Sequence, residues 1–282
     1  MQIIADSGAT KVSWRVISDA GEVSQVETSG INAVFMEEDA IESILRDRVV
    51  PAAGRKVDEI FFYGAGLVGG ETNSKLERCL SDVFPGAKVE AYSDILAAAR
   101  ALCGRKPGIA CILGTGSNSC FYDGAVAESP VKAGGFILGD EASGAYFGKR
   151  LLSDFIKGLL PPALEKEFTR RFPDLDYPAI VQKVYREPLP NRFLASFSPF
   201  LREFRNHPHI SAMLKSGFEE FLRRNVVHYD YKKYPVNFVG SVAYYHKDIL
   251  EKTVAAAGMR LGKVLRDPID GLMEYHKTSL NA

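Results

Sequence analysis

The sequence predicts an α/β protein built from two similar halves. Its 282 residues exceed the size at which one hydrophobic core is usual, so two domains are expected. Apolar strand-like runs alternate with helical ones in the first part of the chain. A strand–turn–strand unit also occurs twice, first as Ile3–Ala5, Asp6–Lys11 and Val12–Ile17, and again as Ile109–Leu113, Gly114–Ser117 and Asn118–Asp123. These observations indicate a duplicated architecture with an interdomain cleft.

The first half is expected to form one mixed sheet. Its further strands are Val23–Thr28, Glu59–Tyr63 and Ala87–Tyr92, with helices near Glu37–Val50 and Asn73–Val83. The links at residues 8–11 and 19–21 are too short for crossover helices, so the first three strands should form an antiparallel meander. The later strands are separated by helices and should be parallel. The first domain is expected to cover residues 1–106, completed by a terminal helix within 267–282.

The second domain, expected over 107–266, is enlarged by helices. The predicted helices are Ala142–Lys157, Ala163–Phe172, Ala179–Tyr185, Asn191–Phe204, Ile210–Tyr229, Val242–Ala256 and, after the domain, Ile269–Lys277. A strand is predicted at Val236–Val239. The aromatic stripe of Phe193, Phe197, Phe200 and Phe204 has helical spacing, which is more typical of core packing than of a ligand surface.

Composition excludes several classes of protein. The 35 basic residues are balanced by 35 acidic ones, so neither a nucleic acid nor a membrane surface is an expected partner. No signal peptide and no long apolar span is visible, which predicts a cytoplasmic location. The four cysteines have no paired C-x-x-C spacing, so buried thiols are expected rather than structural zinc.

Two glycine-containing turns carry the first indication of function. Glycines in Asp6–Lys11 and Gly114–Ser117 would let backbone N–H groups approach phosphate oxygens, with hydroxyls as further donors. Either turn alone is at least as well explained by a plain hairpin. The pair suits a nucleotide held between two halves, whereas neither turn has the P-loop or dinucleotide-binding spacing.

Asp94 follows a predicted strand and opens a helix, which is where α/β proteins place ligands and catalytic groups. The alternative is that Ser93 or Asp94 is an N-cap. The stretch from Gly134 to Gly144 holds Asp140 and Glu141 between glycines. A carboxylate there can accept hydrogen bonds from sugar hydroxyls, although the acids alone could also be helix caps.

Two shorter signals are weak by themselves. Asn32, in the loop at Gly30–Asn32, could donate to and accept from a polar ligand. Gly240 and Ser241 join a strand to a helix, a junction that allows close approach by an adenine or a ribose.

Taken in order, these residues resemble the N-acetylglucosamine kinase branch of the BadF/BadG/BcrA/BcrD ATPase family. That family has two ribonuclease H-like domains of the actin-like ATPase class. The resemblance rests on Asp6–Lys11, Gly30–Asn32, Ser93-Asp94, Leu113–Asn118, Gly134-Gly135 with Leu138–Glu141, and Gly240–Val242. Ser7, Ala9 and Ala142 stand where relatives commonly have glycine.

The resemblance implies ATP and Mg²⁺ as cofactors and assigns a role to each motif. Asp6 would hold Mg²⁺ through water, and Asp94 would be the catalytic base and contact the sugar. The nucleotide would be bound by Ser7, Gly8, Thr10, Lys11, Gly114, Thr115, Gly116, Ser117, Gly240 and Ser241. The sugar would be bound by Asn32, Thr115, Gly135, Asp140 and Glu141.

The function expected from the sequence is ATP-dependent phosphorylation of a primary hydroxyl of an amino sugar. N-acetylglucosamine is favoured, with N-acetylmuramic acid and glucosamine as alternatives. A BadF-type activator ATPase would need cysteine ligands for an iron–sulfur cluster, and Cys111 and Cys120 show no such pattern. An actin-like filament protein would not need Asn32, Asp94 and Asp140. A homodimer is common among such kinases and stays open.

Overall fold

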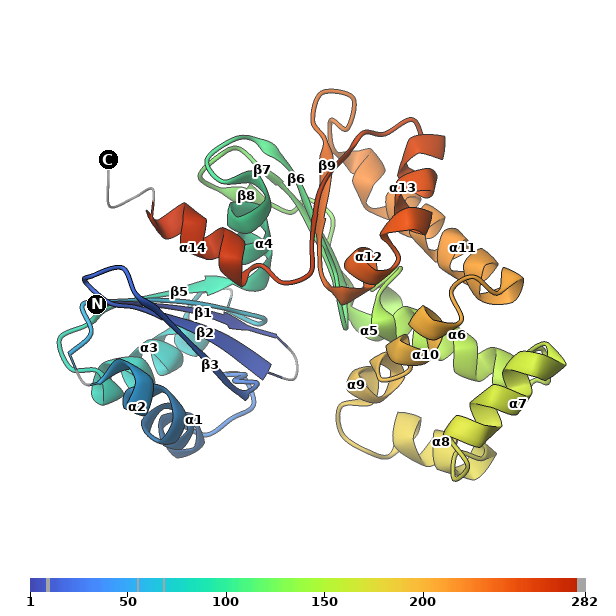
Figure 1. Ribbon diagram of the computed structural model, residues 1–282, viewed down its shortest axis with the longest axis horizontal. Coiled ribbons are helices and arrows are strands. Elements are labelled where there is room, and N and C mark those ends of the chain that lie inside the picture. The colour runs from blue at the N-terminus through green and yellow to red at the C-terminus, as the bar shows by residue number, and fades with distance from the viewer. Residues whose placement is uncertain (9–10, 55, 68, 278–282) are drawn as a thin grey trace. The chain divides into compact units, whose positions relative to one another are not determined.

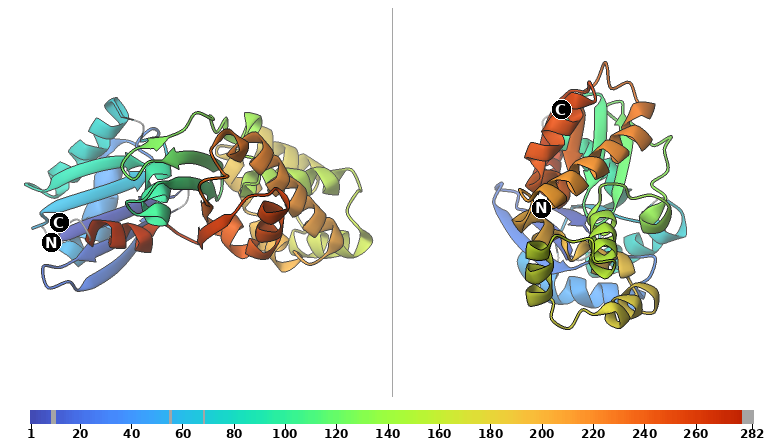
Figure 2. Two further views of the ribbon diagram at one scale, coloured as in Figure 1. Left: turned by 90° about the horizontal axis from the view of Figure 1, so that it is seen from above. Right: turned by 90° about the vertical axis from the view of Figure 1, so that its right-hand side faces the viewer.

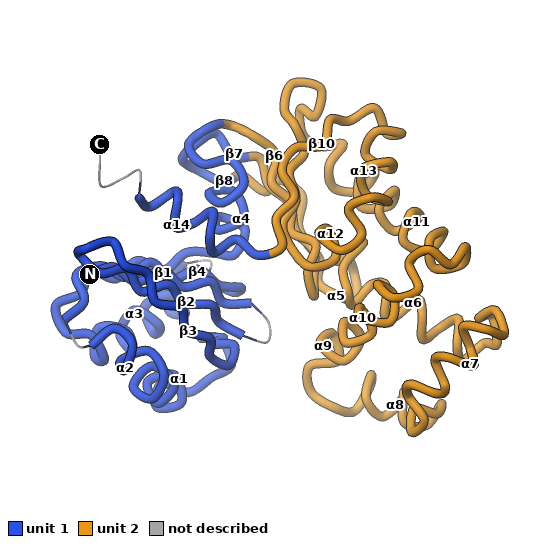
Figure 3. The backbone as a smooth tube through the Cα atoms, viewed as in Figure 1, with its two compact units in different colours: residues 1–106, 122–127, 267–282 blue, residues 107–121, 128–266 orange. Residues whose placement is uncertain are grey.

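The computed structural model describes residues 1–8, 11–54, 56–67 and 69–277. The chain forms two compact units. Unit 1 comprises residues 1–106, 122–127 and 267–282, and unit 2 comprises 107–121 and 128–266 (Figure 3). Each unit contains one five-stranded sheet flanked by helices, as the α/β prediction requires (Figures 1 and 2).

The sheet of unit 1 has the order β3-β2-β1-β4-β5. Its strands are β1 (Gln2–Ser7), β2 (Lys11–Ile17), β3 (Val23–Ser29), β4 (Glu59–Gly64) and β5 (Lys88–Ser93). β1, β2 and β3 pair antiparallel, and β4 and β5 run parallel to β1. The expected meander and the expected parallel strands are both confirmed.

Helices cover the two faces of this sheet (Figure 1). One layer contains α1 (Glu38–Ile44), the π-helical turn η1 (Leu45–Val49), α2 (Val50–Ala53) and α3 (Glu71–Val83). Their apolar side chains join strand residues such as Ile3 and Trp14 in one core cluster. The other layer contains α4 (Asp94–Cys103) and α14 (Ile269–Lys277), which pack on each other and on β1. The final helix of the chain therefore belongs to the first sheet.

The sheet of unit 2 has the order β10-β9-β6-β7-β8. Its strands are β6 (Gly108–Leu113), β7 (Ser117–Tyr122), β8 (Ala127–Glu128), β9 (Val236–Val239) and β10 (Leu261–Leu265). Read from β8, the order is third, second, first, fourth and fifth strand, as in unit 1. β9 is parallel to β6 and β10 is parallel to β9. The duplication expected from the two hairpins is present in the topology.

A helical segment separates β8 from β9. It contains α5 (Gly135–Leu138), α6 (Gly144–Ile156), α7 (Pro162–Arg171), α8 (Tyr177–Tyr185), α9 (Pro190–Ala195), α10 (Ser198–Glu203), α11 (Pro208–Arg224) and the 3₁₀ turn η2 (Val226–His228). Helices α12 (Ser241–Tyr245) and α13 (Lys247–Ala256) follow β9. Phe197 and Phe200 are buried in the core of unit 2, with Phe193 and Phe204 packed against it. The aromatic stripe is core, as predicted.

Two predicted helices were wrong in detail. The helix expected over 191–204 is interrupted between α9 and α10, where Pro199 occupies the first turn of the second helix. The helix expected over 242–256 is broken at His246, whose backbone leaves the helical region. Strand β10 was not predicted, because a five-residue run containing a glycine and a lysine has little periodicity.

No helix in the described residues is long and apolar enough to cross a membrane.

The packing of α6 on α9 depends on a glycine. A Cβ added to Gly148 would lie 1.8 Å from the carbonyl oxygen of Leu194. Gly148→Ala should therefore displace α9 and lower the free energy of unfolding by about 1–3 kcal/mol. That cost exceeds the gain of about 1 kcal/mol from replacing glycine by alanine within a helix.

Urea denaturation of Gly148→Ala would measure this cost. The control is Lys149→Ala, an exposed position of the same helix, which should stay within about 0.5 kcal/mol of the wild type. Equal stability of the two variants would contradict the close helix packing.

Candidate active site

The C-terminal ends of three parallel strands meet at one edge of the first sheet. Ser7 of β1 pairs with Gly64 of β4, and Gly64 pairs with Ser93 of β5. Asp6 immediately precedes Ser7, and Asp94 immediately follows Ser93. The strand register therefore brings together two carboxylates that are far apart in the sequence.

Asp94 is the first residue of α4, and the residue before it performs the capping. The Oγ of Ser93 accepts a hydrogen bond of 3.4 Å from the backbone N–H of Leu96. The Asp94 carboxylate is therefore not needed as the N-cap. The sequence left open whether Ser93 or Asp94 is the N-cap of α4, and the structure shows that it is Ser93.

Asp6 lies half-buried at the end of β1 and has the most perturbed carboxyl of this edge. Burial, followed by the charges of Asp267 and Asp94, raises its pKa to about 7, while the charge of Lys11 acts in the opposite direction. A cation beside Asp6 would relieve this repulsion. Among the described residues, no three His, Cys, Asp or Glu side chains are grouped so that they could hold a metal ion.

The side chains around Asp6 already have partners within unit 1. The Ser7 hydroxyl donates a 2.8 Å hydrogen bond to the carbonyl oxygen of Ile31, which ties the loop of Asn32 to the end of β1. The Lys11 ammonium pairs with Glu27 at 2.5 Å. Ser7 thus links the end of β1 to the loop that contains Asn32. Lys11 would reach a phosphate only by changing partners.

The Asn32 side chain closes its own loop. Its Oδ1 accepts a 3.0 Å hydrogen bond from the N–H of Val34. Its amide group makes no hydrogen bond with a described residue and keeps both donors for a ligand. At the first turn, the Gly8 N–H donates to the Lys11 carbonyl at 2.9 Å. Thr10, predicted to bind phosphate, lies outside the described residues, as does Ala9.

In unit 2 the second turn that was predicted to bind phosphate, Gly114–Ser117, is joined to the start of α6 by backbone hydrogen bonds. The carbonyl oxygens of Gly114 and Thr115 accept hydrogen bonds from the N–H groups of Gly144 and Ala145, at 2.8 and 3.1 Å. The Gly114 N–H donates to Gly116 at 3.0 Å, which closes the turn. The turn is therefore fixed by backbone contacts.

The junction at Gly240 and Ser241 lies beside this turn, because β6 and β9 are parallel neighbours. A Cβ on Gly240 would lie 2.3 Å from the carbonyl oxygen of Leu113, and its φ of +124° is also unsuited to other residues. Glycine is thus required for the two strand ends to meet. Ser241, the first residue of α12, is exposed at this edge.

Asp140 lies against the turn from Gly114 to Ser117. Its Oδ1 accepts a 2.9 Å hydrogen bond from the N–H of Ser117, and a Cβ on Gly116 would lie only 3.0 Å from its Oδ2. Burial raises the pKa of Asp140, and the charge of Glu141 adds to the shift. Helix α6 is capped by Ser143, whose Oγ accepts from the Tyr146 N–H, so capping does not explain Asp140.

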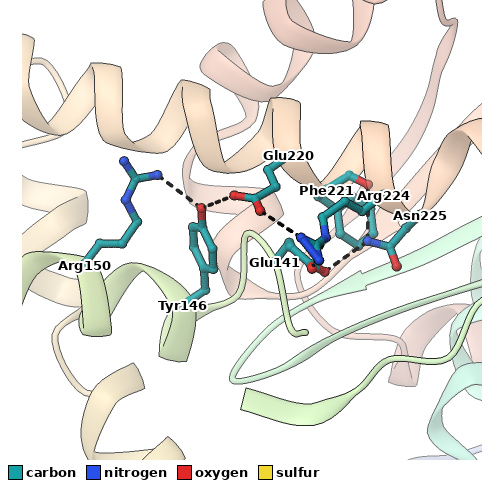
Figure 4. A network of polar contacts seen from close by, with 7 residues as sticks. All are labelled: Glu141, Tyr146, Arg150, Glu220, Phe221, Arg224 and Asn225. Carbon is teal, nitrogen blue, oxygen red and sulfur yellow. Dashed lines mark hydrogen bonds and ion pairs between the residues drawn. The ribbon is translucent and has the colours of Figure 1, made fainter. Parts of the chain in front are cut away.

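Glu141 points to a different part of unit 2. Its side chain is buried, and its two carboxylate oxygens contact Arg224, the last residue of α11, and the C-cap residue Asn225, at 2.8 and 3.2 Å (Figure 4). Gly135 begins α5, and its carbonyl accepts from the Gly139 N–H at 2.8 Å. Both were predicted to bind sugar, and the contacts described here are to protein.

Three residues that contact or perturb the candidate site residues were not predicted from the sequence. Gly64 lies between Ser7 and Ser93, and a Cβ there would be 3.3 Å from the Cβ of Ser7. Asp267 perturbs Asp6, and its only sequence signal is its place before Pro268 and a helix. Arg224 ends an amphipathic helix, where a basic residue is unremarkable.

The cysteines are core or near-core thiols. No disulfide bond joins any two of the four cysteines. Cys79, Cys111 and Cys120 are buried and Cys103 is half-buried. Cys111 and Cys120 lie within β6 and β7.

The whole chain superposes on a candidate N-acetylglucosamine kinase of Porphyromonas gingivalis, with 39% sequence identity and a TM-score of 0.94, covering 99% of this chain and 100% of that one. The chain belongs to the N-acetylglucosamine kinase-like family. No protein-family model and no curated protein sequence matches it.

More distant structures share the fold of this N-acetylglucosamine kinase-like protein. A candidate N-acetylglucosamine kinase of Chromobacterium violaceum is 20% identical, with a TM-score of 0.74 over 97% of this chain and 98% of that one. A ROK family protein of Streptococcus pneumoniae, solved with sucrose, is 12% identical, with a TM-score of 0.50 over 99% of this chain and 100% of that one. The fold is that of actin-like ATPases and sugar kinases.

The raised pKa of Asp6 gives a stability prediction. The unfolded-state pKa of an aspartate is about 4, and the folded-state pKa is about 7. Ionised Asp6 therefore destabilises the fold increasingly as pH rises from about 4 to about 7. Without ligands, Asp6→Asn should be more stable than the wild type by about 1–4 kcal/mol at pH 8, and the gain should shrink towards pH 4.

Urea denaturation at several pH values would measure this difference. Asp82→Asn, at an exposed carboxyl of α3, is the control and should show no such pH-dependent gain. A gain for Asp6→Asn that does not change with pH would contradict the perturbed carboxyl.

Proposed function

We propose that this protein transfers the γ-phosphoryl group of MgATP to a primary hydroxyl of an amino sugar, with N-acetylglucosamine as the favoured acceptor. The observation that carries the proposal is the strand register of unit 1. It puts Asp94 and Asp6 at the same C-terminal edge of the sheet, with β4 between their strands, and Ser93 rather than Asp94 is the N-cap of α4. A base next to a cation-binding carboxylate suits phosphoryl transfer.

In the proposed reaction, the sugar hydroxyl oxygen forms a bond to the γ-phosphorus while the bond from that phosphorus to the ADP oxygen breaks. Asp94 accepts the hydroxyl proton. Asp6 would hold Mg²⁺ through water, and the cation, when bound, would supply neutralisation of the phosphate charge. The high pKa of Asp6 supports this role, because a divalent cation would keep that carboxyl ionised at neutral pH.

Binding of the two substrates is assigned to both units. The backbone N–H groups of Gly8 and of the turn from Gly114 to Ser117 would contact phosphates, with Thr10, Thr115 and Lys11 as side-chain donors. Gly240 and Ser241 would contact adenosine. The amide of Asn32 and the carboxylate of Asp140 would bind sugar hydroxyls, with the backbone near Gly135 beside them.

The choice of N-acetylglucosamine as acceptor rests on similarity to a related protein. The relative at 39% identity is named as a candidate N-acetylglucosamine kinase. The carboxyl group of Asp140 and the amide of Asn32 suit any acceptor rich in hydroxyls, which includes glucosamine and N-acetylmuramic acid.

Replacing the proposed base tests the mechanism. Asp94→Asn should lower kcat by about 10²–10⁴, the usual contribution of a general base, with little change in the affinity for the sugar. Steady-state kinetics and sugar titration of the variant would measure both quantities.

The control is Asp39→Asn, which changes an exposed aspartate in the first turn of another helix of unit 1 and should leave kcat unchanged. Wild-type turnover in Asp94→Asn would reject the base assignment.

The acceptor is tested by measuring ADP release with a panel of sugars. N-acetylglucosamine should give the highest kcat/KM, above glucosamine, N-acetylmuramic acid, N-acetylmannosamine and glucose. ADP release that no sugar stimulates would contradict the kinase proposal, and a higher kcat/KM for another sugar would replace the acceptor while leaving the reaction in place.

A further inference from the structure

Asp140 belongs to a turn whose backbone is strained. Asp140 and Ala142 both have positive φ angles, 55° and 57°, although neither is glycine. L-residues adopt this region only at a cost in free energy, so other contacts must hold the turn. Glu141 is the residue between them.

Glu141 is anchored on both carboxylate oxygens. Arg224 Nε donates to one oxygen at 2.8 Å, and Asn225 Nδ2 donates to the other at 3.2 Å. Its side chain is only 10% exposed, whereas that of Arg224 is 47% exposed. The carboxylate is therefore surrounded by protein, and its position is set by the last turn of α11.

The anchor continues into a polar network between α6 and α11 (Figure 4). Arg224 also pairs with Glu220 at 3.4 Å, and Glu220 accepts a 2.6 Å hydrogen bond from the Tyr146 hydroxyl. Arg150 donates to the same hydroxyl at 3.2 Å and to Ser216 at 2.7 Å.

A glycine lets the two helices come this close. A Cβ on Gly217 of α11 would lie 2.4 Å from the ring of Phe147 of α6. The network thus joins α11 to the helix that begins just after the strained turn.

We propose that Arg224, acting through Glu141, is a positioning residue that holds the Asp140 carboxylate in place for the sugar. The proposal rests on the kinase function proposed above and assigns Glu141 to the anchor rather than to the substrate. The carboxylate of Asp140 is fixed at one side by the Ser117 N–H and Gly116. Its backbone N–H donates to Ala133 and its carbonyl accepts from Ser143, and the side chain of the next residue, Glu141, is held by Arg224.

The first test is independent of activity. The Ser117 N–H donates to Asp140 Oδ1, so its hydrogen exchange reports whether that carboxylate stays in place. In Arg224→Ala, exchange of this amide should become roughly tenfold faster than in the wild type. Arg224 is half exposed, so the variant should fold.

The matched control is Arg223→Ala, which removes the neighbouring exposed arginine of α11. It should leave Ser117 exchange unchanged. If Arg224→Ala lowers only the global stability, with unchanged exchange at Ser117 relative to its neighbours in β7, the ion pair is purely structural and the inference is overturned.

The second test uses the sugar kinetics. Arg224→Ala should raise the KM for the sugar roughly tenfold, a change equivalent to one hydrogen bond to a charged group. The KM for ATP should stay within about twofold. In an Asp140→Asn background, Arg224→Ala should change the sugar KM by less than about twofold, because its effect passes through Asp140.

The outcomes separate the two proposals. An equal tenfold effect in both backgrounds would overturn the positioning role while leaving the kinase function intact. No sugar-dependent turnover in the wild type would reject the proposed function, and faster Ser117 exchange in Arg224→Ala would still support the anchoring of Asp140.

Discussion

Within each unit, the candidate site residues depend on parallel strand pairing at the C-terminal edge of that unit's own sheet. In unit 1, the pairing of Ser7 with Gly64 and of Gly64 with Ser93 fixes where Asp6 and Asp94 lie. A shift of one residue in that register would turn every side chain to the other face of the sheet. In unit 2, the pairing of β6 with β9 similarly brings the turn after Leu113 to Gly240.

The same register places carboxylates where they oppose one another. Asp6 is half-buried near Asp94 and Asp267, and its pKa rises as a result. This arrangement lowers the free energy of unfolding of the unit, because the carboxylates repel one another. It becomes favourable when a cation is present, which is consistent with a site organised around a metal–nucleotide substrate.

In unit 2 the candidate site residues are held in place by backbone hydrogen bonds. Backbone hydrogen bonds from Gly144 and Ala145 fix the turn at Gly114 and Thr115, and the Asp140 carboxylate rests on Gly116. The absence of a side chain at Gly116 leaves room for that carboxylate. Preorganisation of this kind reduces the rearrangement needed when a substrate binds.

The sequence by itself determined the α/β class, the duplicated hairpins, the order of parallel and antiparallel strands in unit 1 and the membership of the aromatic stripe in the core. These follow from local periodicity, from glycine turns and from link lengths, which are properties of neighbouring residues. Ser93 and Asp94 could be singled out, but that Ser93 is the N-cap and Asp94 is not could not be told from the sequence.

Only the tertiary structure decided the rest. The burial of Asp6 and its proximity to Asp267 depend on where the final helix packs, far along the chain. The role of Glu141 depends on α11, whose Arg224 lies more than eighty residues away and looks like an ordinary helix end. Strand β10 forms because β9 offers it a parallel edge, and its short sequence carries no such signal. Contacts between distant segments are set by packing, and one sequence without relatives to compare does not reveal them.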